Sequence, residues 1–350
     1  MPDDLSLPNR TGDPLSQAVH AVEELRRLSG LRSDWDWSRA AVIAREWKYL
    51  EPVRSFCEAE SIPTQIANES QPNFWRLRET QSLVSWLRQR ERSAIHVSEL
   101  VDWIDLQSVG PWWSVLREGI DEFARDVGDR DTDRSDVLEA LAEWGRDIRS
   151  RQNGLLLLTA HRAKGLEFDN VVVLDGAWEK RSRNEDPDAV RRLLYVAMTR
   201  ARQNLLLMFL GERHPLLSDG NSSTTLVRSC SPVDVSKCKR RYMSLGPADV
   251  DLDFLGRFRD GAKSISAVAG LKTGDVLSVT QDNGRWVLTD ADATPVCRLA
   301  KRFSPPTDRK LTRANVRAIL IRTKEDSRLE FQKRLKQDRW SAVLPDMVFD

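Results

Sequence analysis

Several features that would define a class of protein are missing from this sequence of 350 residues. Hydrophobic residues make up 40% of it, but charged residues make up 31% and break up every apolar run before it could span a bilayer. The first thirty residues carry acidic side chains and no apolar segment typical of a secretory signal. These absences exclude a membrane-spanning protein and predict a cytoplasmic one.

Cysteine is also scarce. The four cysteines, at positions 57, 230, 238 and 297, lie far apart and form no CxxC pair. Such spacing argues against a disulfide framework and against a zinc site. We therefore predict four reduced thiols without a metal.

A phosphate-binding loop is absent as well. The pattern G-x-x-x-x-G-K-[ST], whose backbone amides and lysine hold nucleotide phosphates, occurs nowhere in the sequence. The segment at residues 270–274 has two glycines and a lysine, but neither the spacing nor the Lys-Ser/Thr pair. The chain alone is thus not expected to bind a nucleotide as a complete ATPase does.

Charge is balanced overall but not along the chain. Residues 221–350 contain 24 basic and 16 acidic residues, whereas residues 1–220 contain 30 and 37. Within the acidic part, residues 99–147 hold 14 acidic against 5 basic residues, and within the basic part, residues 298–339 hold 14 basic against 5 acidic residues. A phosphate backbone should be repelled by the middle segment and met by the C-terminal part or by local basic sites.

Periodicity in the first half predicts an α/β pattern that is then interrupted. Residues 14–29 place apolar side chains on one helical face, and residues 40–44 form a short buried-strand run. A helix at 50–60 and a strand at 63–67 complete a β-α-β unit. From 73 to 150 the pattern is helical and rich in tryptophan, which indicates an acidic all-helical insertion.

Continuous apolar strands return after the insertion. Residues 155–159, 171–174 and 205–210 are apolar runs, with a helical stretch at 188–201 between the last two. Strands covered on both faces by helices have this composition, so we predict an open parallel α/β sheet. Beyond a polar linker at 219–225, the residues alternate between apolar and polar and are separated by turn signals, which indicates a small antiparallel β domain.

The predicted organisation has five parts. They are an N-terminal helix with the first part of the α/β domain (1–72), the acidic helical insertion (73–150), the second part of the α/β domain (151–220), the small β domain (225–306) and a basic helical tail (307–350).

Two stretches carry residues suited to chemistry. The first, Thr-Ala-His-Arg-Ala-Lys-Gly-Leu-Glu-Phe at 159–168, directly follows a buried strand, where open α/β sheets place their ligands. The second, at 191–202, reads Arg-Arg-Leu-Leu-Tyr-Val-Ala-Met-Thr-Arg-Ala-Arg. An arginine presented from a helix end can stabilise charge on a transferred phosphoryl group, because its guanidinium stays ionised and can bind two oxygens.

These two stretches resemble motifs V and VI of the UvrD/Rep/PcrA-type superfamily-1 DNA helicases. More weakly, the strand that precedes Arg45 and the Ser-Ile-Pro at 61–63 resemble neighbouring elements of that family. The resemblance covers about residues 38–212 and implies a second RecA-like domain. A looser resemblance is to the C-terminal extension of some long bacterial RecQ-like helicases.

The resemblance implies roles for particular residues. Arg200 would be the arginine finger at the γ-phosphate, Glu167 would bind the ribose of ATP, and Gly165 would let backbone approach the phosphates. Thr159, His161 and Arg45 would contact the phosphate backbone of single-stranded DNA. The first RecA-like domain, which holds the phosphates and Mg²⁺, would come from another chain or from a longer parent, and this chain alone should be inactive.

Alternatives remain open at several points. Arg191, Arg192 and Arg202 could form ion pairs or contact nucleotide, and the basic stretch at 298–339 could bind nucleic acid or be a solvated surface. The tryptophans at helical spacing are expected to pack in a core rather than to stack on bases. A second functional class is a non-enzymatic module that binds DNA or protein and derives from a truncated helicase.

Overall fold

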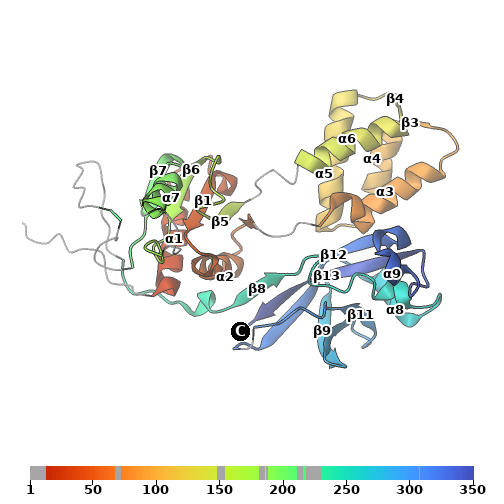
Figure 1. Ribbon diagram of the computed structural model, residues 1–350. Coiled ribbons are helices and arrows are strands. Elements are labelled where there is room, and N and C mark those ends of the chain that lie inside the picture. Colours follow the sequence, from red (N-terminus) through yellow and green to blue (C-terminus); the bar gives the residue numbers. More distant parts are fainter. Residues whose placement is uncertain are drawn as a thin grey trace, which may run out of the picture. The chain divides into compact units, whose positions relative to one another are not determined.

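The computed structural model divides into two compact units. The described residues are 13–67, 72–147, 154–180, 188–210, 230–306 and 308–350, together with 186, 216 and 217. The first unit contains residues 1–69, 152–242 and 350, and the second contains residues 70–151 and 243–349 (Figure 1). The linker expected at 219–225 lies outside the described residues.

A five-stranded parallel sheet forms the centre of the first unit, in the order β2-β5-β1-β6-β7. Its strands are β1 (Ala40–Ala44), β2 (Thr64–Ile66), β5 (Leu155–Thr159), β6 (Phe168–Val173) and β7 (Ala201–Leu207). This is the parallel α/β sheet that the apolar runs predict, with the helical segment inserted between β2 and β5.

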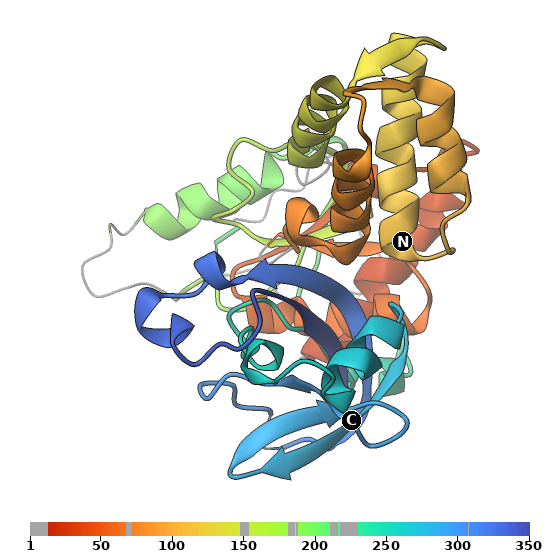
Figure 2. The ribbon, with the colours of Figure 1, turned by 90° about the vertical axis from the view of Figure 1, so that its right-hand side faces the viewer.

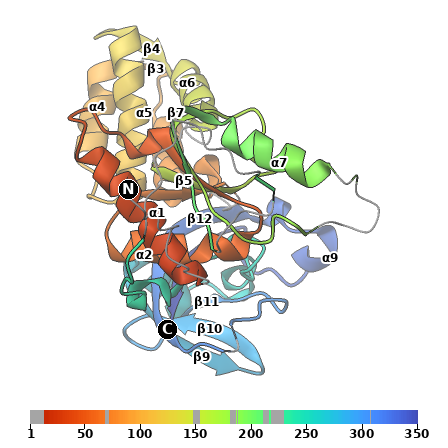
Figure 3. The same cartoon turned by 90° about the vertical axis from the view of Figure 1, so that its left-hand side faces the viewer.

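Helices cover both faces of this sheet. Helices α1 (Pro14–Ser29) and α2 (Glu51–Ala59) share a buried cluster with Val42 and Leu157, whereas α7 (Ala189–Met198) shares another with Ile43 and Leu158 (Figure 3). Successive strand residues face opposite sides, so a strand between two helical layers must be apolar at every position. This explains the uninterrupted apolar runs of β1 and β5.

The second unit begins with the expected insertion (Figure 2), which is mostly helical but not all-helical as predicted, because it contains a short pair of strands. Its helices are α3 (Arg78–Gln89), α4 (Val97–Asp105), α5 (Pro111–Val127) and α6 (Arg134–Asp147), with the short antiparallel pair β3 (Ala94–His96) and β4 (Asp131–Asp133) between them. Helices α5 and α6 pack closely: the ring of Trp144 lies 2.8 Å from where a Cβ on Gly119 would stand. None of the described helices is both long and apolar enough to cross a membrane.

An antiparallel sheet completes the second unit, in the order β11-β10-β9-β12-β13-β8. Its strands are β8 (Arg241–Ser244), β9 (Val276–Asp282), β10 (Arg285–Thr289), β11 (Pro295–Arg298), β12 (Leu311–Thr323) and β13 (Arg339–Phe349), and helix α8 (Lys263–Gly270) precedes β9. The β9–β10 hairpin turns at Asn283 and Gly284, whose φ angles are 49° and 71°. An Asn-Gly pair suits this left-handed turn, so one of the turn signals expected between the strands of the β domain is confirmed.

The prediction of a basic helical tail at 307–350 is wrong. Residues 311–323 and 339–349 are the paired strands β12 and β13, and the only α-helix described between them is the four-residue α9 (Leu329–Gln332). In β12 the buried residues Ala314, Val316 and Ala318 alternate with less buried ones. That spacing of two is a strand signal, and the many basic side chains had obscured it.

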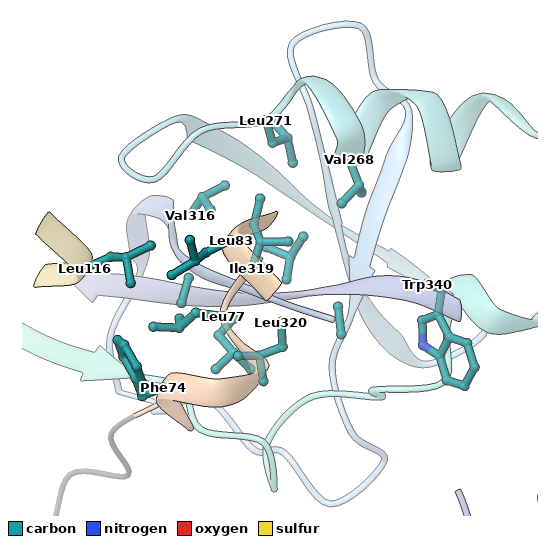
Figure 4. Packing of buried hydrophobic residues seen from close by; sticks show 14 of the residues in the cluster. Phe74, Leu77, Leu83, Leu116, Val268, Leu271, Val316, Ile319, Leu320 and Trp340 are labelled. Carbon is teal, nitrogen blue, oxygen red and sulfur yellow. The ribbon is translucent and has the colours of Figure 1, made fainter. Parts of the chain in front are cut away.

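The insertion and the β domain share one hydrophobic core rather than forming separate domains. Phe74, Leu83 and Leu116 of the helical part belong to the same buried cluster as Ile319 and Leu320 of β12 (Figure 4). The indole of Trp112 donates a hydrogen bond of 2.7 Å to the carbonyl of Arg317. The expectation that tryptophans pack in a core is confirmed, because those of the insertion lie in or against this cluster.

Short 3₁₀ helices connect several of these elements. They span Trp37–Arg39, Trp47–Tyr49, Phe74–Arg76, Ser236–Cys238, Leu255–Arg257 and Lys324–Asp326.

Candidate functional site

The residues predicted to function lie at two opposite edges of the parallel sheet in the first unit. Thr159 ends β5, whereas Glu167 directly precedes β6. Because β5 and β6 both run parallel to β1, the end of one and the start of the other are at opposite edges. Residues 160–167 must therefore return the chain from one edge to the other. They do so through hydrogen-bonded turns, in which Ala163 donates its N–H to the carbonyl of Thr159 over 3.2 Å and Leu166 to that of Ala163 over 3.1 Å.

Arg45, Thr159 and His161 form the carboxyl-edge group. Thr159 pairs with Ala44 in the register of β5 and β1, so the residues after both strands emerge side by side. The Nη1 atom of Arg45 lies 3.1 Å from Nε2 and 3.3 Å from Nδ1 of His161. The structure thus brings together all three residues that sequence reasoning assigned to the DNA backbone.

The groups around this edge are mostly basic. Lys48 and Lys180 lie 3.0 Å and 3.2 Å from the two carboxylate oxygens of Glu46, the residue after Arg45. Hydrogen bonds from Lys48 and then Lys180 lower the pKa of the Glu46 carboxyl, so it stays ionised and is matched by two cations. With Arg45 added, the edge suits an anion such as a phosphate.

Sequence reasoning missed Lys48 and Lys180. Lys180 follows β6 in the chain, and its carbonyl accepts a 3.4 Å hydrogen bond from Arg45. The only available signal was that both lysines follow buried strands, which is too common to single them out.

Gly165, Glu167 and Arg200 form the amino-edge group. Phe168 begins β6 and donates its backbone N–H to the carbonyl of Arg200 over 2.9 Å, so the turn before β6 lies beside the turn before β7. The expectation that the whole 159–168 stretch lies at the carboxyl ends of the strands is therefore wrong for its second half. A parallel connection has to return the chain to the start of the next strand.

The guanidinium of Arg200 is held by three acceptors. Nε donates to the carbonyl of Val196 over 2.9 Å, Nη1 to that of Leu166 over 3.1 Å, and Nη2 to the hydroxyl of Thr199 over 3.1 Å. The side chain is fixed between the end of α7 and the turn before β6 and is only partly buried. An arginine held in this way is oriented before any ligand arrives.

Glu167 points to solvent but is paired with a residue whose role was left open. Nε and Nη2 of Arg202 lie 3.0 Å and 2.9 Å from Oε2 of Glu167, whose side chain is 53% exposed. Arg192 likewise pairs with Asp186 at 2.6 Å. For Arg192 and Arg202, the ion-pair alternative is the one that the structure shows.

Gly165 adopts a conformation that favours glycine. Its φ angle is 86°, and no heavy atom lies within 4 Å of the position that a Cβ would occupy. Its backbone is thus open to a ligand, unlike that of Gly176, where a Cβ would lie 2.4 Å from the ring of Tyr49. At position 165 the reason for glycine is backbone conformation and access rather than packing.

Comparison with known proteins concerns the segment that carries five of these six residues. Residues 154–208 match the family model of the UvrD-like helicase C-terminal domain. In addition, 70 residues are 47% identical to a protein of Bacillus subtilis (strain 168) named "Putative ATP-dependent DNA helicase YjcD". The alignment covers 17% of this chain and 9% of that relative. Both similarities support the resemblance of this chain to the C-terminal part of superfamily-1 helicases, and the family model places that resemblance at residues 154–208.

Proposed function

We propose that this chain is the C-terminal module of an ATP-dependent DNA helicase, and that its first unit is the second RecA-like domain. The observation that carries the proposal is the UvrD-like segment at 154–208, whose motif residues gather into two polar groups at the edges of one parallel sheet. Translocation and unwinding would then require a first RecA-like domain with the phosphate-binding loop and the Mg²⁺ site. That domain would be in another chain or in a longer parent, such as a long RecQ-like helicase.

The amino-edge group would face ATP. Glu167 offers a carboxylate oxygen to the ribose hydroxyls, Gly165 an open backbone, and Arg200 a fixed guanidinium. Hydrolysis of bound ATP supplies the free energy for movement. Arg200 would stabilise the charge that develops at the γ-phosphate, with Arg202 holding Glu167 until a ribose replaces it.

The carboxyl-edge group would hold a phosphate of single-stranded DNA. Arg45 and His161 supply the donors beside each other, and the hydroxyl of Thr159 makes no hydrogen bond among the described residues. Residues 160–167 connect this group to the amino-edge group. A shift of Glu167 or Gly165 on nucleotide release would be transmitted through this short crossover to His161, which couples the nucleotide state to the grip on DNA.

A second candidate is a non-enzymatic module that binds DNA or protein. The hydrogen bonds that Arg200 and Glu167 make within the unit favour it, because both side chains then have a purely structural use. The two candidates differ in whether the chain contributes to ATP hydrolysis by a first RecA-like domain.

The test measures the rate of DNA-stimulated ATP hydrolysis in three mixtures. Each contains the first RecA-like domain together with the wild-type chain, the Arg200→Ala variant or the Arg192→Ala variant. The helicase proposal expects Arg200→Ala to lower the rate by about a thousandfold or more, as loss of an arginine finger does. Arg192→Ala removes an exposed ion pair from helix α7, which ends just before Arg200, and should leave the rate near wild type. Equal rates for the two variants would remove the finger assignment and favour the non-enzymatic module.

A further inference from the structure

A groove in the second unit has the chemistry of a ligand site. It measures about 320 Å³ and is lined by helix α3, helix α4 and strands β12 and β13. Its described lining residues are two arginines, three glutamines, two serines, two tryptophans and one isoleucine, with no carboxylate among them. The second unit contains none of the residues assigned to the helicase site.

The positive charge lies at one end of this groove. Arg78 is the first residue of α3, and Arg339 donates a 3.1 Å hydrogen bond from Nη2 to Oε1 of Gln81, one turn further along. Arg339 is exposed and forms no ion pair among the described residues. Arg78 already has partners: Nη1 donates to the carbonyl of Leu271 over 2.8 Å, and Nη2 lies 3.7 Å from a carboxylate oxygen of the buried Glu79. Arg339 is therefore the guanidinium that has donors left for an anion.

Amide and aromatic groups lie at the other end. Trp86 is about 12 Å further along the axis of α3 than Arg78, from a rise of 1.5 Å per residue. Its ring stacks on that of Trp103 with centroids 5.2 Å apart, and the guanidinium of Arg90 lies over it at 5.0 Å. The rings thus contribute mainly their edges to the groove. Beside them, Gln89 makes no hydrogen bond within the described residues.

We infer that this groove binds an unpaired nucleotide, with its phosphate at Arg339 and its base at the glutamines and tryptophan edges. Guanidinium groups bind phosphate oxygens, and glutamine amides pair with the donors and acceptors on a base edge. An acidic peptide would match the charge, but a base combines hydrogen-bonding groups and an aromatic ring in one planar unit, which suits an end lined by both amides and indole edges. The nucleotide is either free or part of a single strand.

The test measures binding of fluorescein-labelled oligodeoxythymidine by anisotropy, using the full chain. The background carries Arg45→Ala and His161→Ala, so that the proposed helicase site does not contribute. Arg339→Glu should lower the affinity about tenfold or more, because a charge-assisted hydrogen bond is replaced by repulsion. Arg88→Glu is the control with the same change of charge: Arg88 is exposed on α3 but does not line the groove, so the affinity of this variant should stay near that of the background protein.

Competition experiments distinguish a free nucleotide from a nucleotide within a single strand. Displacement of the probe by free thymidine monophosphate indicates a mononucleotide site, and displacement only by unlabelled oligodeoxythymidine indicates a strand site; both support the inference. Binding of fluorescein-labelled oligoglutamate that Arg339→Glu abolishes, with no loss of oligodeoxythymidine affinity in that variant, would show a peptide groove and overturn it.

Photo-crosslinking fixes the location. An oligonucleotide with 5-iododeoxyuridine should crosslink to peptides that contain Trp86 or Trp103, and Gln89→Glu should reduce the yield. No binding in the Arg45→Ala, His161→Ala background, equal losses for Arg339→Glu and Arg88→Glu, or crosslinks confined to other peptides would each overturn the inference. Binding that Arg45→Ala abolishes and Arg339→Glu leaves unchanged would overturn it while leaving the helicase proposal intact.

Discussion

The two units use their charged side chains in opposite ways. At the sheet edges of the first unit, Glu167, Arg200 and His161 remain at least partly accessible beside open backbone. In the second unit, which contains the basic stretch, many arginines are tied into the fold. Arg257, Arg285 and Arg298 all lie within 3.4 Å of one carboxylate, that of Asp251.

The comparison shows that the number of basic residues in a segment does not tell how many of them are available to bind a ligand. Arg317 pairs with Asp346 and Arg322 with Asp253, and their side chains are only 10% and 18% exposed. The excess of basic residues at 298–339 therefore serves the fold to a large extent. A basic composition indicates a nucleic-acid surface only where the structure leaves the guanidinium groups without carboxylates, as at Arg339.

The largest effect on stability is expected from Asp251→Asn. The Asp251 side chain is 15% exposed, and its loss leaves Arg257 and Arg298 close together without a counter-charge. Removing one partner from a largely buried ionic cluster should lower the free energy of unfolding of the second unit by about 3 kcal/mol. Urea unfolding of wild type and Asp251→Asn measures this loss of free energy. Glu330→Ala breaks a pair of 3.9 Å with the highly exposed Arg328 and should change stability by less than about 0.5 kcal/mol.

Two glycines of the first unit are expected to be glycine for different reasons: Gly176 because a neighbouring ring packs closely against it, and Gly165 because of its backbone conformation and access. Gly176→Ala should cost roughly 2 kcal/mol, because its φ is 115° and the new Cβ would meet the Tyr49 ring. In Gly165→Ala the new Cβ meets no neighbouring atom, so the free energy of unfolding should fall by only about 1 kcal/mol, the cost of placing alanine at a φ of 86°. Thermal unfolding of the two variants measures the difference. A larger loss at position 165 would show that this backbone is packed rather than open.

The grip on DNA can be tested at the two ends of one strand. Arg45 follows the carboxyl end of β1, and Arg39 precedes its amino end, where it pairs with Asp169 at 3.6 Å. Arg45→Ala should weaken binding of single-stranded DNA severalfold and reduce the salt dependence by about one unit of slope, as expected for one lost phosphate contact. Arg39→Ala should do neither. Equal effects in a salt titration would mean that the carboxyl edge has no special role.

Acid should weaken the Asp251 cluster gradually. Burial alone would raise the pKa of Asp251, but hydrogen bonds from Arg257 and Arg298 outweigh it, and the pKa is lowered. A lowered folded-state pKa stabilises the unit above the unfolded value of about 3.9, and this contribution is lost as the pH falls toward the folded value. The free energies of unfolding of wild type and Asp251→Asn, measured between pH 6 and pH 3, should differ less as the pH falls. A difference independent of pH would contradict the ionic origin.

Sequence reasoning succeeded where the local pattern decides the structure. The helix at 14–29 and the strands at 40–44 and 155–159 have the predicted bounds, since each carries its own periodicity. It failed at 307–350, because the many basic side chains obscured the alternation of buried residues in β12, which pairs with the next strand, β13.

The candidate site could likewise be predicted only in part. The motif order predicts which residues matter, and the structure places all six of them at edges of one sheet. The separation into two edges follows from the parallel topology of β5, β1 and β6, which no short motif encodes. The pairing of Glu167 with Arg202 depends on side-chain geometry, which the sequence does not give either.

The central claim, that this chain supplies one wall of an ATP site, is tested most directly by DNA-stimulated ATP hydrolysis in three samples: the chain alone, a first RecA-like domain alone, and the two mixed. The account predicts no hydrolysis by the chain alone and a rate in the mixture far above that of the separate domain. Hydrolysis by the chain alone, or a mixture no faster than the separate domain, would contradict it.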